Sequence, residues 1–316
     1  MITVVIPLYN KEATIKRTIE SVLAQSVRDW ELIVVDDGSS DAGPEYVRRF
    51  GDARIRLVTQ PNSGVSAARN KGVELATNDM VAFLDADDYW AEDHLFNLRR
   101  LIDVFPCSSL YATAYQVVGA DGRVRKIRLR EIENHEELIC LEDYFADVMD
   151  YENPVSSSAV AMNKNTLNEV GGFPLGVKSG EDLITWARLA CKGSIAYSRH
   201  ATSFYVLPPV DRATNRKAIR QPQKPDYVGQ ELSRLSNQCG HLAASVNRYL
   251  GGWYRIRAML FMELNRRRES LIELSKAVRA SGLRPRDIAS LGLLIMPGGL
   301  RAMMLSNWRQ LIGRIR

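Results

Sequence analysis

Three carboxylates within four residues directly follow an apolar run early in the chain. The run, residues 80–84, is short and uninterrupted, as expected of a parallel strand buried on both faces. Asp85, Asp87 and Asp88 come next, and carboxylates at a buried strand end are costly unless a cation lies among them. We interpret Asp85 and Asp87 as ligands of Mg²⁺ or Mn²⁺, because hard oxygen ligands suit these ions and phosphates usually complete the shell. The alternative is a solvated acidic turn in which Asp88 caps the helix that follows.

The elements that would position these acids alternate between strand and helix over residues 1–90. Such alternation predicts a parallel sheet with crossover helices. Tyr9-Asn10, Asp36-Asp37 and Asp85-Ala86-Asp87 each follow a strand-like run. Because parallel neighbours bring their carboxyl ends to one edge of a sheet, we expect these three polar clusters to converge on one crevice. The strand-like runs are residues 3–6, 31–35, 55–59 and 80–84, and the helical segments between them are residues 13–25, 45–50 and 65–76.

Beyond residue 90 the pattern becomes mixed and then purely helical. Strand-like segments flank the turn pair Asp121-Gly122, which predicts a hairpin. The basic run at residues 123–130 reads as a solvated strand face, with contact to an acidic acceptor as the alternative. Only helical patterns follow residue 227, so we expect domains at residues 1–226 and 227–316. The remaining expected elements are strands 110–118, 124–129, 155–162 and 202–207, and helices 92–105, 164–170, 228–250, 253–265, 267–280, 285–296 and 300–315.

The composition is that of an ordinary globular protein, with 46% of the 316 residues hydrophobic and 25% charged. The net charge of +5 is compatible with nucleic acid, anionic lipid or phosphate-bearing ligands. The chain lacks G-x-G-x-x-G and G-x-x-x-x-G-K-S/T segments, which argues against a dinucleotide dehydrogenase and a P-loop enzyme. Its cysteines form no C-x-x-C, so we expect no zinc ribbon.

Six short motifs resemble those of family 2 glycosyltransferases in order and spacing. They are VVIPLYN, LAQS, ELIVVDDGSSD, SGVSAARNKG, FLDADD and GED. The similarity covers roughly residues 1–205. It implies the GT-A fold, a Rossmann-like and mostly parallel α/β sheet flanked by helices, here with a C-terminal all-helical extension. It also implies a nucleotide-sugar donor, a divalent metal (Mn²⁺ or Mg²⁺) and inversion at the anomeric carbon.

The resemblance assigns five residues to the nucleotide side of the crevice. Pro7 and Tyr9 match residues that line the nucleoside pocket, and Tyr9 could stack on the base. Asp37, with Asp36 beside it, matches the acid that accepts a hydrogen bond from a uracil ring. Arg69, in the segment AARNKG, matches a basic residue near the base and the phosphates.

Four acids match the reacting end of the crevice. Asp85 and Asp87 match the D-x-D pair, with Asp87 as the more direct metal ligand. Asp182 matches the catalytic base and Glu181 flanks it, at the start of a segment with helical periodicity. Chemistry supports this division, because a carboxylate that holds metal at the departing diphosphate cannot also deprotonate the attacking hydroxyl. Acids in a first helical turn also complement the helix dipole, and that plainer reading of Glu181 and Asp182 stays open.

The resemblance predicts a hexosyl- or N-acetylhexosaminyl-transferase that adds one sugar from a UDP-sugar to a cell-surface glycan or its lipid-linked precursor. The chain has no Q-x-x-R-W segment after GED, which favours single addition over polymerisation. A sugar nucleotidyltransferase is a second hypothesis, although such enzymes usually have a Gly-rich loop with Arg and Lys where this chain has residues 7–10. A non-catalytic nucleotide-sugar-binding protein is a third, although a binder has no use for a base. We expect no nucleic-acid partner.

The C-terminal segment, residues 300–315, is basic and amphipathic. Its apolar stripe fits an anionic membrane surface or packing on another part of the protein, and periodicity alone does not distinguish these. The chain begins directly in a strand-like segment, and no apolar run has the length of a membrane span. We therefore expect a cytoplasmic location, with peripheral contact at the inner face of the cytoplasmic membrane as the form that lipid binding would take.

Overall fold

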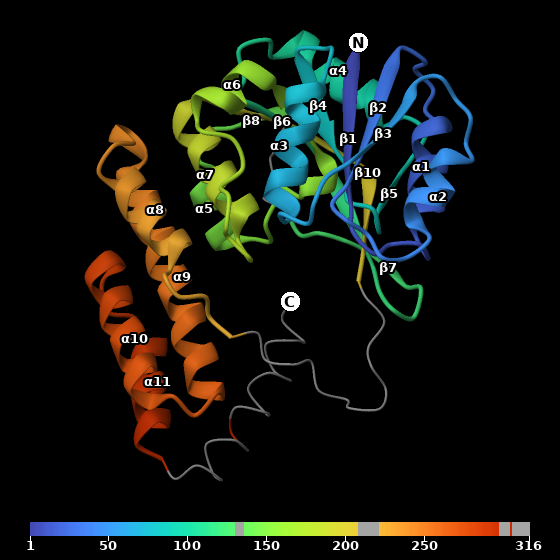
Figure 1. Ribbon diagram of the computed structural model, residues 1–316. Helices are drawn as coiled ribbons and strands as arrows, with labels where there is room; N and C mark the ends of the chain where they lie inside the picture. The colour runs from blue at the N-terminus through green and yellow to red at the C-terminus, as the bar shows by residue number, and fades with distance from the viewer. Residues whose placement is uncertain (130–135, 208–220, 297–303, 305–316) are drawn as a thin grey trace. The chain divides into compact units, whose positions relative to one another are not determined.

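The computed structural model describes residues 1–129, 136–207, 221–296 and 304. Contacts between Cα atoms divide the chain into two compact units, Met1–Val210 and Asp211–Arg316 (Figure 1). The first unit combines a sheet with helices, and the described part of the second is helical. Residues 208–220 lie outside the described part, so the domain boundary expected after residue 226 stays a prediction.

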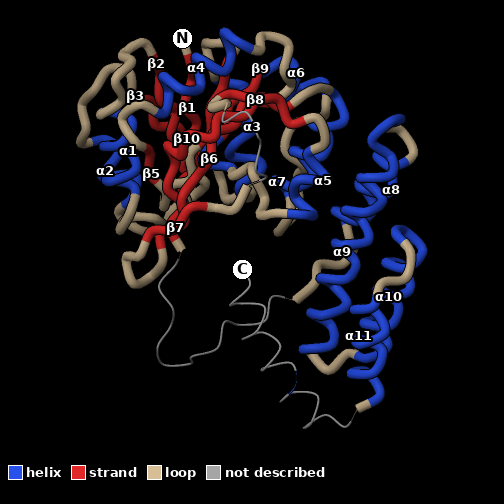
Figure 2. The backbone as a smooth tube through the Cα atoms, turned by 180° about the vertical axis from the view of Figure 1, so that it is seen from behind, coloured by secondary structure: helices blue, strands red, loops and turns tan. Residues whose placement is uncertain are grey.

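One sheet runs through the first unit in the order β3-β2-β1-β4-β9-β6-β10-β5, with β7 beside β6 and β8 beside β10 (Figure 2). Its strands within the described residues are β1 (Ile2–Leu8), β2 (Trp30–Asp36), β3 (Ile55–Thr59), β4 (Met80–Phe83), β5 (Tyr89–Trp90), β6 (Leu110–Val118), β7 (Val124–Lys126), β8 (Leu138–Leu141), β9 (Val160–Asn163) and β10 (Ile195–Val206).

The part of the sheet formed by β1 to β4 is parallel, as residues 1–90 predict. β1 pairs in parallel with both β2 and β4, and β2 pairs in parallel with β3. The three polar clusters lie at or just after the ends of β1, β2 and β4, and therefore at the same edge of the sheet. The rest of the sheet is mixed, because β9 is antiparallel to both β4 and β6, while β10 is parallel to β6. The hairpin of β6 and β7 is confirmed.

Helices cover both faces of this sheet (Figure 1). Ile6 of β1 shares a buried core cluster with Ile19 of α1. The neighbouring Val5 points to the opposite face, where a Cβ on Gly72 of α3 would lie 2.3 Å from its Cγ1. Only glycine lets α3 approach β1 so closely. The helices of this unit are α1 (Ile15–Leu23), α2 (Gly43–Arg48), α3 (Val65–Leu75), α4 (His94–Val104), α5 (Tyr144–Asp150), η1 (Ser157–Ala159), α6 (Lys164–Glu169) and α7 (Glu181–Lys192).

Several elements of the first unit differ from the sequence-based expectation. β10 begins earlier than the strand expected at 202–207. Register shifts around Ala201 interrupt its alternating pattern, so the sequence predicts only the last part of this strand. The strand expected at 155–162 starts later, as β9, after the short turn η1. β5, β8 and α5 were not expected, and β5 has only two residues, too few to form a pattern.

The second unit differs from expectation at a glycine pair. Helix α9 continues through Gly251 and Gly252, where the sequence predicts a break between helices 228–250 and 253–265. A Cβ on Gly251 would lie 2.0 Å from Ser281 Oγ, so this glycine serves close packing of α9 and α10. The break instead lies between α8 and η2. The described elements are α8 (Tyr227–Ser236), η2 (Gly240–Leu242), α9 (Ala243–Glu263), α10 (Arg267–Ser281) and α11 (Pro285–Ile295).

The amphipathic helix expected at 300–315 lies outside the described residues, apart from Met304. Among the helices that the structure describes, none has both the length and the apolar composition of a membrane span.

Candidate functional site

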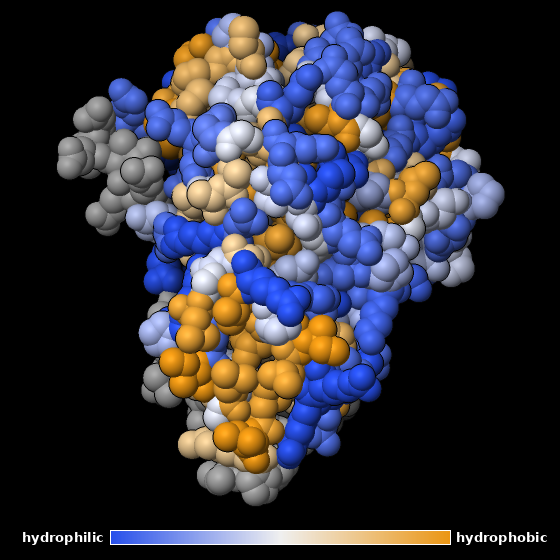
Figure 3. All heavy atoms as spheres, turned by 90° about the vertical axis from the view of Figure 1, so that its left-hand side faces the viewer, coloured by the Kyte–Doolittle hydropathy of each residue, from blue (hydrophilic) through white to orange (hydrophobic). Residues whose placement is uncertain are grey.

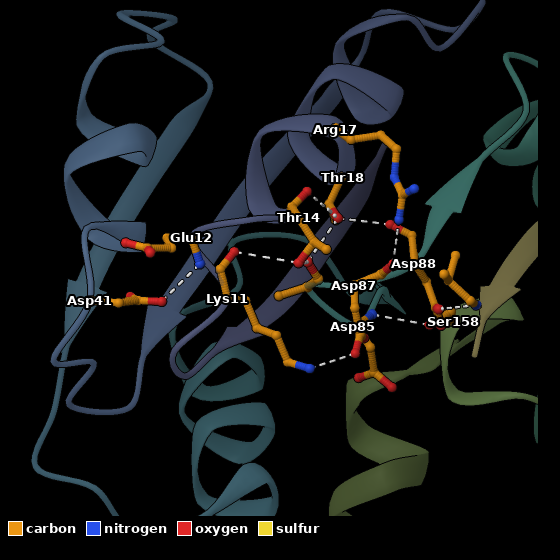
Figure 4. A network of polar contacts seen from close by, with 12 residues as sticks. Lys11, Glu12, Thr14, Arg17, Thr18, Asp41, Asp85, Asp87, Asp88 and Ser158 are labelled. Atoms are coloured by element: carbon orange, nitrogen blue, oxygen red, sulfur yellow. Dashed lines mark hydrogen bonds and ion pairs between the residues drawn. The ribbon is translucent and has the colours of Figure 1, made fainter. Parts of the chain in front are cut away.

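Two loops at the edge of the parallel strands are tied together by side chains. Asn10, after β1, has a positive φ of 51° that Asn tolerates better than most residues, and its backbone N–H donates to Ser39 Oγ at 3.1 Å. The N–H of Glu12 donates to Asp41 Oδ2 at 2.8 Å (Figure 4). These bonds hold the loop after β1 against the loop after β2, with Tyr9 exposed at its end.

Asp36 and Asp37 are both buried at the end of β2. The carboxylate of Asp37 accepts the side-chain amide of Gln60 at 2.8 Å and the backbone N–H groups of Ser63 at 2.9 Å and Gly64 at 2.8 Å. Asp37 therefore fixes the loop that starts α3. A carboxylate has about four acceptor positions, and the described residues occupy three of those of Asp37.

Each acid of the D-x-D pair lies beside a cation. Asp87 Oδ2 lies 2.6 Å from Lys11 Nζ (Figure 4). Asp85 Oδ1 lies 2.7 Å from Arg69 Nη2. Arg17 donates to the backbone oxygen of Asp87 at 2.7 Å. Lys11 and Arg17 were not anticipated from the sequence. The only signal for Lys11 was its place just after Tyr9-Asn10, at the same strand end.

Asp88 lies on the inner side of the same segment, 1% exposed. It accepts the hydroxyl of Ser158 at 2.6 Å and the backbone N–H of Val206 at 2.8 Å. Burial, reinforced by the negative charge of Asp85, raises the pKa of Asp88 to about 8. Asp88 does not cap the following helix, which begins at His94, so the capping role given to Asp88 in the alternative is wrong.

Arg69 joins the D-x-D segment to the GED segment. Arg69 is 2% exposed, and its guanidinium contacts Asp85 at 2.7 Å and Glu181 Oε1 at 3.4 Å. The ring of Phe173 lies 5.2 Å from its central carbon, a distance typical of a cation–π contact. Two acidic segments that are far apart in sequence therefore meet at one arginine.

Gly180 turns the chain into α7 with a φ of 87°, which glycine adopts without strain. This turn presents Glu181 and Asp182 at the start of the helix. Glu181 is engaged with Arg69, whereas the carboxylate of Asp182 accepts, among the described residues, the N–H of Leu183 at 2.8 Å. Burial raises the pKa of both acids, against the opposing attraction of Arg69. The carboxylate of Asp182 therefore has one hydrogen bond from the described residues and a raised pKa.

The D-x-D pair has oxygen ligands of the kind that suit a divalent metal. One oxygen of Asp85 and one of Asp87 accept no hydrogen bond from the described residues. No group of three or more potential ligands from His, Cys, Asp and Glu gathers in the described part of the chain. Two carboxylates with substrate phosphates are nevertheless a common environment for Mg²⁺.

Four of the residues that the sequence assigns to the nucleotide side lie at the ends of β1 and β2. Pro7 is half-buried near the end of β1, and Tyr9 follows it with 48% exposure. These two residues and the buried pair Asp36 and Asp37 lie at the ends of adjacent strands. Asp85, Arg69 and Glu181 are in direct contact. The assigned roles themselves remain proposals.

Comparison with known proteins gives one family. Residues 3–170 match the model of glycosyl transferase family 2. The chain is 29% identical over 239 residues to TuaG of Bacillus subtilis, a candidate teichuronic acid biosynthesis glycosyltransferase, covering 74% of this chain and 89% of TuaG. It is 42% identical over 127 residues to WfgD of Escherichia coli, named UDP-Glc:alpha-D-GlcNAc-diphosphoundecaprenol beta-1,3-glucosyltransferase. That match covers 40% of this chain and half of WfgD's length.

Solved structures with the same fold include residues 1–349 of TarS from S. aureus in complex with UDP-GlcNAc. The two structures superpose with a TM-score of 0.67 at 18% sequence identity, over 95% of this chain and 88% of the TarS chain. At this identity the likeness concerns the fold alone.

Proposed function

The chain belongs to glycosyl transferase family 2, and on that premise we propose that it transfers one sugar, with inversion, from a UDP-sugar to an acceptor hydroxyl. It has the GT-A fold and is a glycosyltransferase that uses a nucleotide-sugar donor. The observation that carries the proposal is the contact of Arg69 with both Asp85 and Glu181, because it brings the D-x-D and GED segments together.

The nucleotide would occupy the edge of β1 and β2. Tyr9 offers an exposed ring for stacking on the base, beside Pro7, and Asp37 would accept a hydrogen bond from a base N–H. The hydrogen bonds between the two loops would hold this wall in place before the donor arrives, which would lower the entropic cost of binding. A uracil base is supported by WfgD, whose name states a UDP-Glc donor, and by TarS, crystallised with UDP-GlcNAc. We propose a hexose or N-acetylhexosamine as the transferred sugar.

Asp87 and Asp85 would hold the metal, Mg²⁺ or Mn²⁺. A bound metal supplies positive charge that stabilises the departing diphosphate. The chain provides further positive charge at the same place through Lys11 and Arg69. These cations offset the two carboxylates and keep the site from repelling an anionic donor.

Asp182 is the proposed base. It would take the proton of the acceptor hydroxyl while that oxygen forms the new bond to the anomeric carbon and the carbon–phosphate oxygen bond breaks, releasing UDP. A raised pKa makes a carboxylate a more effective proton acceptor near neutral pH. Glu181 would act through Arg69, holding the guanidinium between the two acidic segments.

The acceptor would be a cell-surface glycan or its lipid-linked precursor, reached at the inner face of the cytoplasmic membrane. The names of WfgD, with a diphosphoundecaprenol acceptor, and TuaG, of teichuronic acid biosynthesis, support this class. Peripheral contact of the C-terminal helices with the membrane is part of the proposal.

The test is a donor screen. Release of UDP from a panel of UDP-sugars would be measured with Mn²⁺, with Mg²⁺ and with a chelator, for the natural protein and for Asp87→Ala. We expect release with one class of donor, dependence on metal, and loss in the variant. The proposal fails if no donor yields UDP, or if the protein instead forms pyrophosphate from UTP and a sugar 1-phosphate.

A further inference from the structure

The helical unit presents a surface that is both apolar and basic. Figure 3 shows hydrophobic atoms gathered in the lower half of that view, with hydrophilic atoms beside them. On α11, Ile288 is 60% exposed and Ile295 is 83% exposed. With Leu291 between them at spacings of three and four residues, they form one stripe along the helix. Three exposed apolar side chains in adjacent turns of one helix form a contiguous patch, and such patches mark interaction sites.

Helix α10 adds a similar face. Leu271 and Ile272 are exposed, and Arg268 and Arg279 lie on the same side of the helix, one and two turns away. No described carboxylate lies within ion-pair distance of either arginine. We call the outer faces of α10 and α11, with these residues and the α11 stripe, the α10–α11 surface.

This part of the chain carries more positive than negative charge. Residues 266–296 contain seven Arg or Lys and three Asp or Glu. Each of the three acids is used inside the unit: Glu269 pairs with Arg266, Glu273 with Arg257 at 3.2 Å, and Asp287 with Arg255 at 2.7 Å. The last two acids are also buried. Because these acids are paired or buried, the exposed arginines determine the electrostatic potential of this surface.

We propose that the α10–α11 surface binds an anionic phospholipid bilayer. A basic face with an apolar stripe is the composition of helices that lie in the membrane interface. A second copy would bring the same positive charge against it. Residues 297–316, which contain four arginines and no acid, carry the same sign and suit the same partner. α11 has 11 residues, about half the length of a span, so it would lie on the bilayer and not cross it.

This inference deepens the proposed function, because it names the surface that would bring the enzyme to lipid-linked acceptors. Its test is independent of transfer. The full-length protein would be sedimented with vesicles of phosphatidylglycerol and phosphatidylcholine, and with vesicles of phosphatidylcholine alone, without donor or acceptor. We expect binding to the anionic vesicles that weakens as salt rises.

Two variants separate the components of the surface. Arg268→Gln with Arg279→Gln should weaken binding roughly thirtyfold, from the loss of two cations at an anionic surface. Ile288→Asn with Ile295→Asn should weaken it at least about tenfold. Control substitutions on the first unit, Val104→Asn and Arg123→Gln, also change exposed residues and should leave binding unchanged. Thermal unfolding of each variant confirms that it is folded.

Two outcomes overturn the proposal. The natural protein could bind anionic vesicles no better than neutral ones, in which case the surface serves another occupant, such as an acidic protein. Alternatively, both surface variants could bind like the natural protein while Leu311→Asn with Ile315→Asn abolishes binding, which assigns the contact to the C-terminal segment alone. UDP release from the donor would be measured for the same protein preparations in the absence of vesicles. This measurement tests the proposed transfer activity separately from membrane binding.

Discussion

The hydroxyl of Ser158 donates to the buried carboxylate of Asp88 over 2.6 Å. The same oxygen accepts the backbone N–H of Asp85 at 3.1 Å, so Ser158 links two acids of one segment (Figure 4). Asp88 also accepts the N–H of Val206 at the end of β10. The position of Asp85, and with it the proposed metal and donor site, therefore depends on a serine from another part of the chain.

Replacing Ser158 should weaken donor binding as well as destabilise the folded protein. Ser158→Ala removes both side-chain bonds, so we expect the KM for the donor and the metal concentration for half-maximal activity to rise several-fold, with a loss of about 1–3 kcal/mol in unfolding free energy. Ser203→Ala is the matched control. Ser203 is equally buried and donates to the backbone oxygen of Ser158 at 2.8 Å, and its hydroxyl makes no hydrogen bond to Asp85 or Asp88. Equal kinetic effects of the two variants would contradict a positioning role.

Asp88 should make the protein less stable as pH rises. Its pKa is about 8 in the folded state against an ordinary 3.8, so the folded state holds an extra proton between these values. The free energy of unfolding therefore falls as pH rises from about 4 to 8. Asp88→Asn keeps an acceptor and a donor at the same place but removes this titration.

The measurement is urea unfolding at pH 5 and pH 8 with a chelator present, because a bound cation would favour the ionised acid. The decrease in stability between the two pH values should be smaller in Asp88→Asn than in the natural protein. Identical decreases would show that Asp88 keeps an ordinary pKa.

Arg69 should be needed for the stability of the folded protein. Arg69→Met leaves Asp85 and Glu181 near each other without their shared cation, and removing one partner of a buried pair is costly. We expect a loss of about 2–4 kcal/mol in unfolding free energy, moderated because the side chain of Asp85 is 29% exposed. Arg100→Met, which breaks an exposed pair with Glu137, should cost at most about 1 kcal/mol. Similar losses from both substitutions would argue against the bridging role.

Asp182 and Glu181 should differ in kinetics. Asp182→Asn is expected to lower kcat roughly a hundred- to ten-thousandfold while donor affinity stays within about threefold, because the base acts on the acceptor hydroxyl. Glu181→Gln keeps the base and should retain more activity. Nucleotide binding by calorimetry, alongside kcat, separates the two roles. Full transfer activity in Asp182→Asn would remove Asp182 from the reaction.

The pH dependence of transfer gives an independent check on the base. Burial raises the pKa of Asp182 above its ordinary 3.8. Because the ionised form is the active one, kcat/KM should rise with pH and level off only above this raised pKa. A profile that already levels off by about pH 5 would mean that the group which must ionise has an unshifted pKa.

The parallel part of the sheet and the acids at its edge were predictable from sequence. Alternating apolar runs and helical segments at residues 1–90 predict β1 to β4, and the acids come where buried strands end. The second half was less predictable. β10 is interrupted by register shifts around Ala201, and Gly251 serves packing against Ser281 and does not end a helix. Such features depend on contacts with distant segments, which local patterns do not contain.

The sequence by itself determined the residue types, their order and the edge of the sheet to which most of them belong. Tertiary structure decided the partners. Arg69 reaches both Asp85 and Glu181, and Lys11 reaches Asp87, only because strands and helices far apart in sequence lie side by side. An ion pair or hydrogen bond needs atoms within a few ångströms of each other. Spacing along the chain sets that distance within one element, but between elements only the folded backbone does.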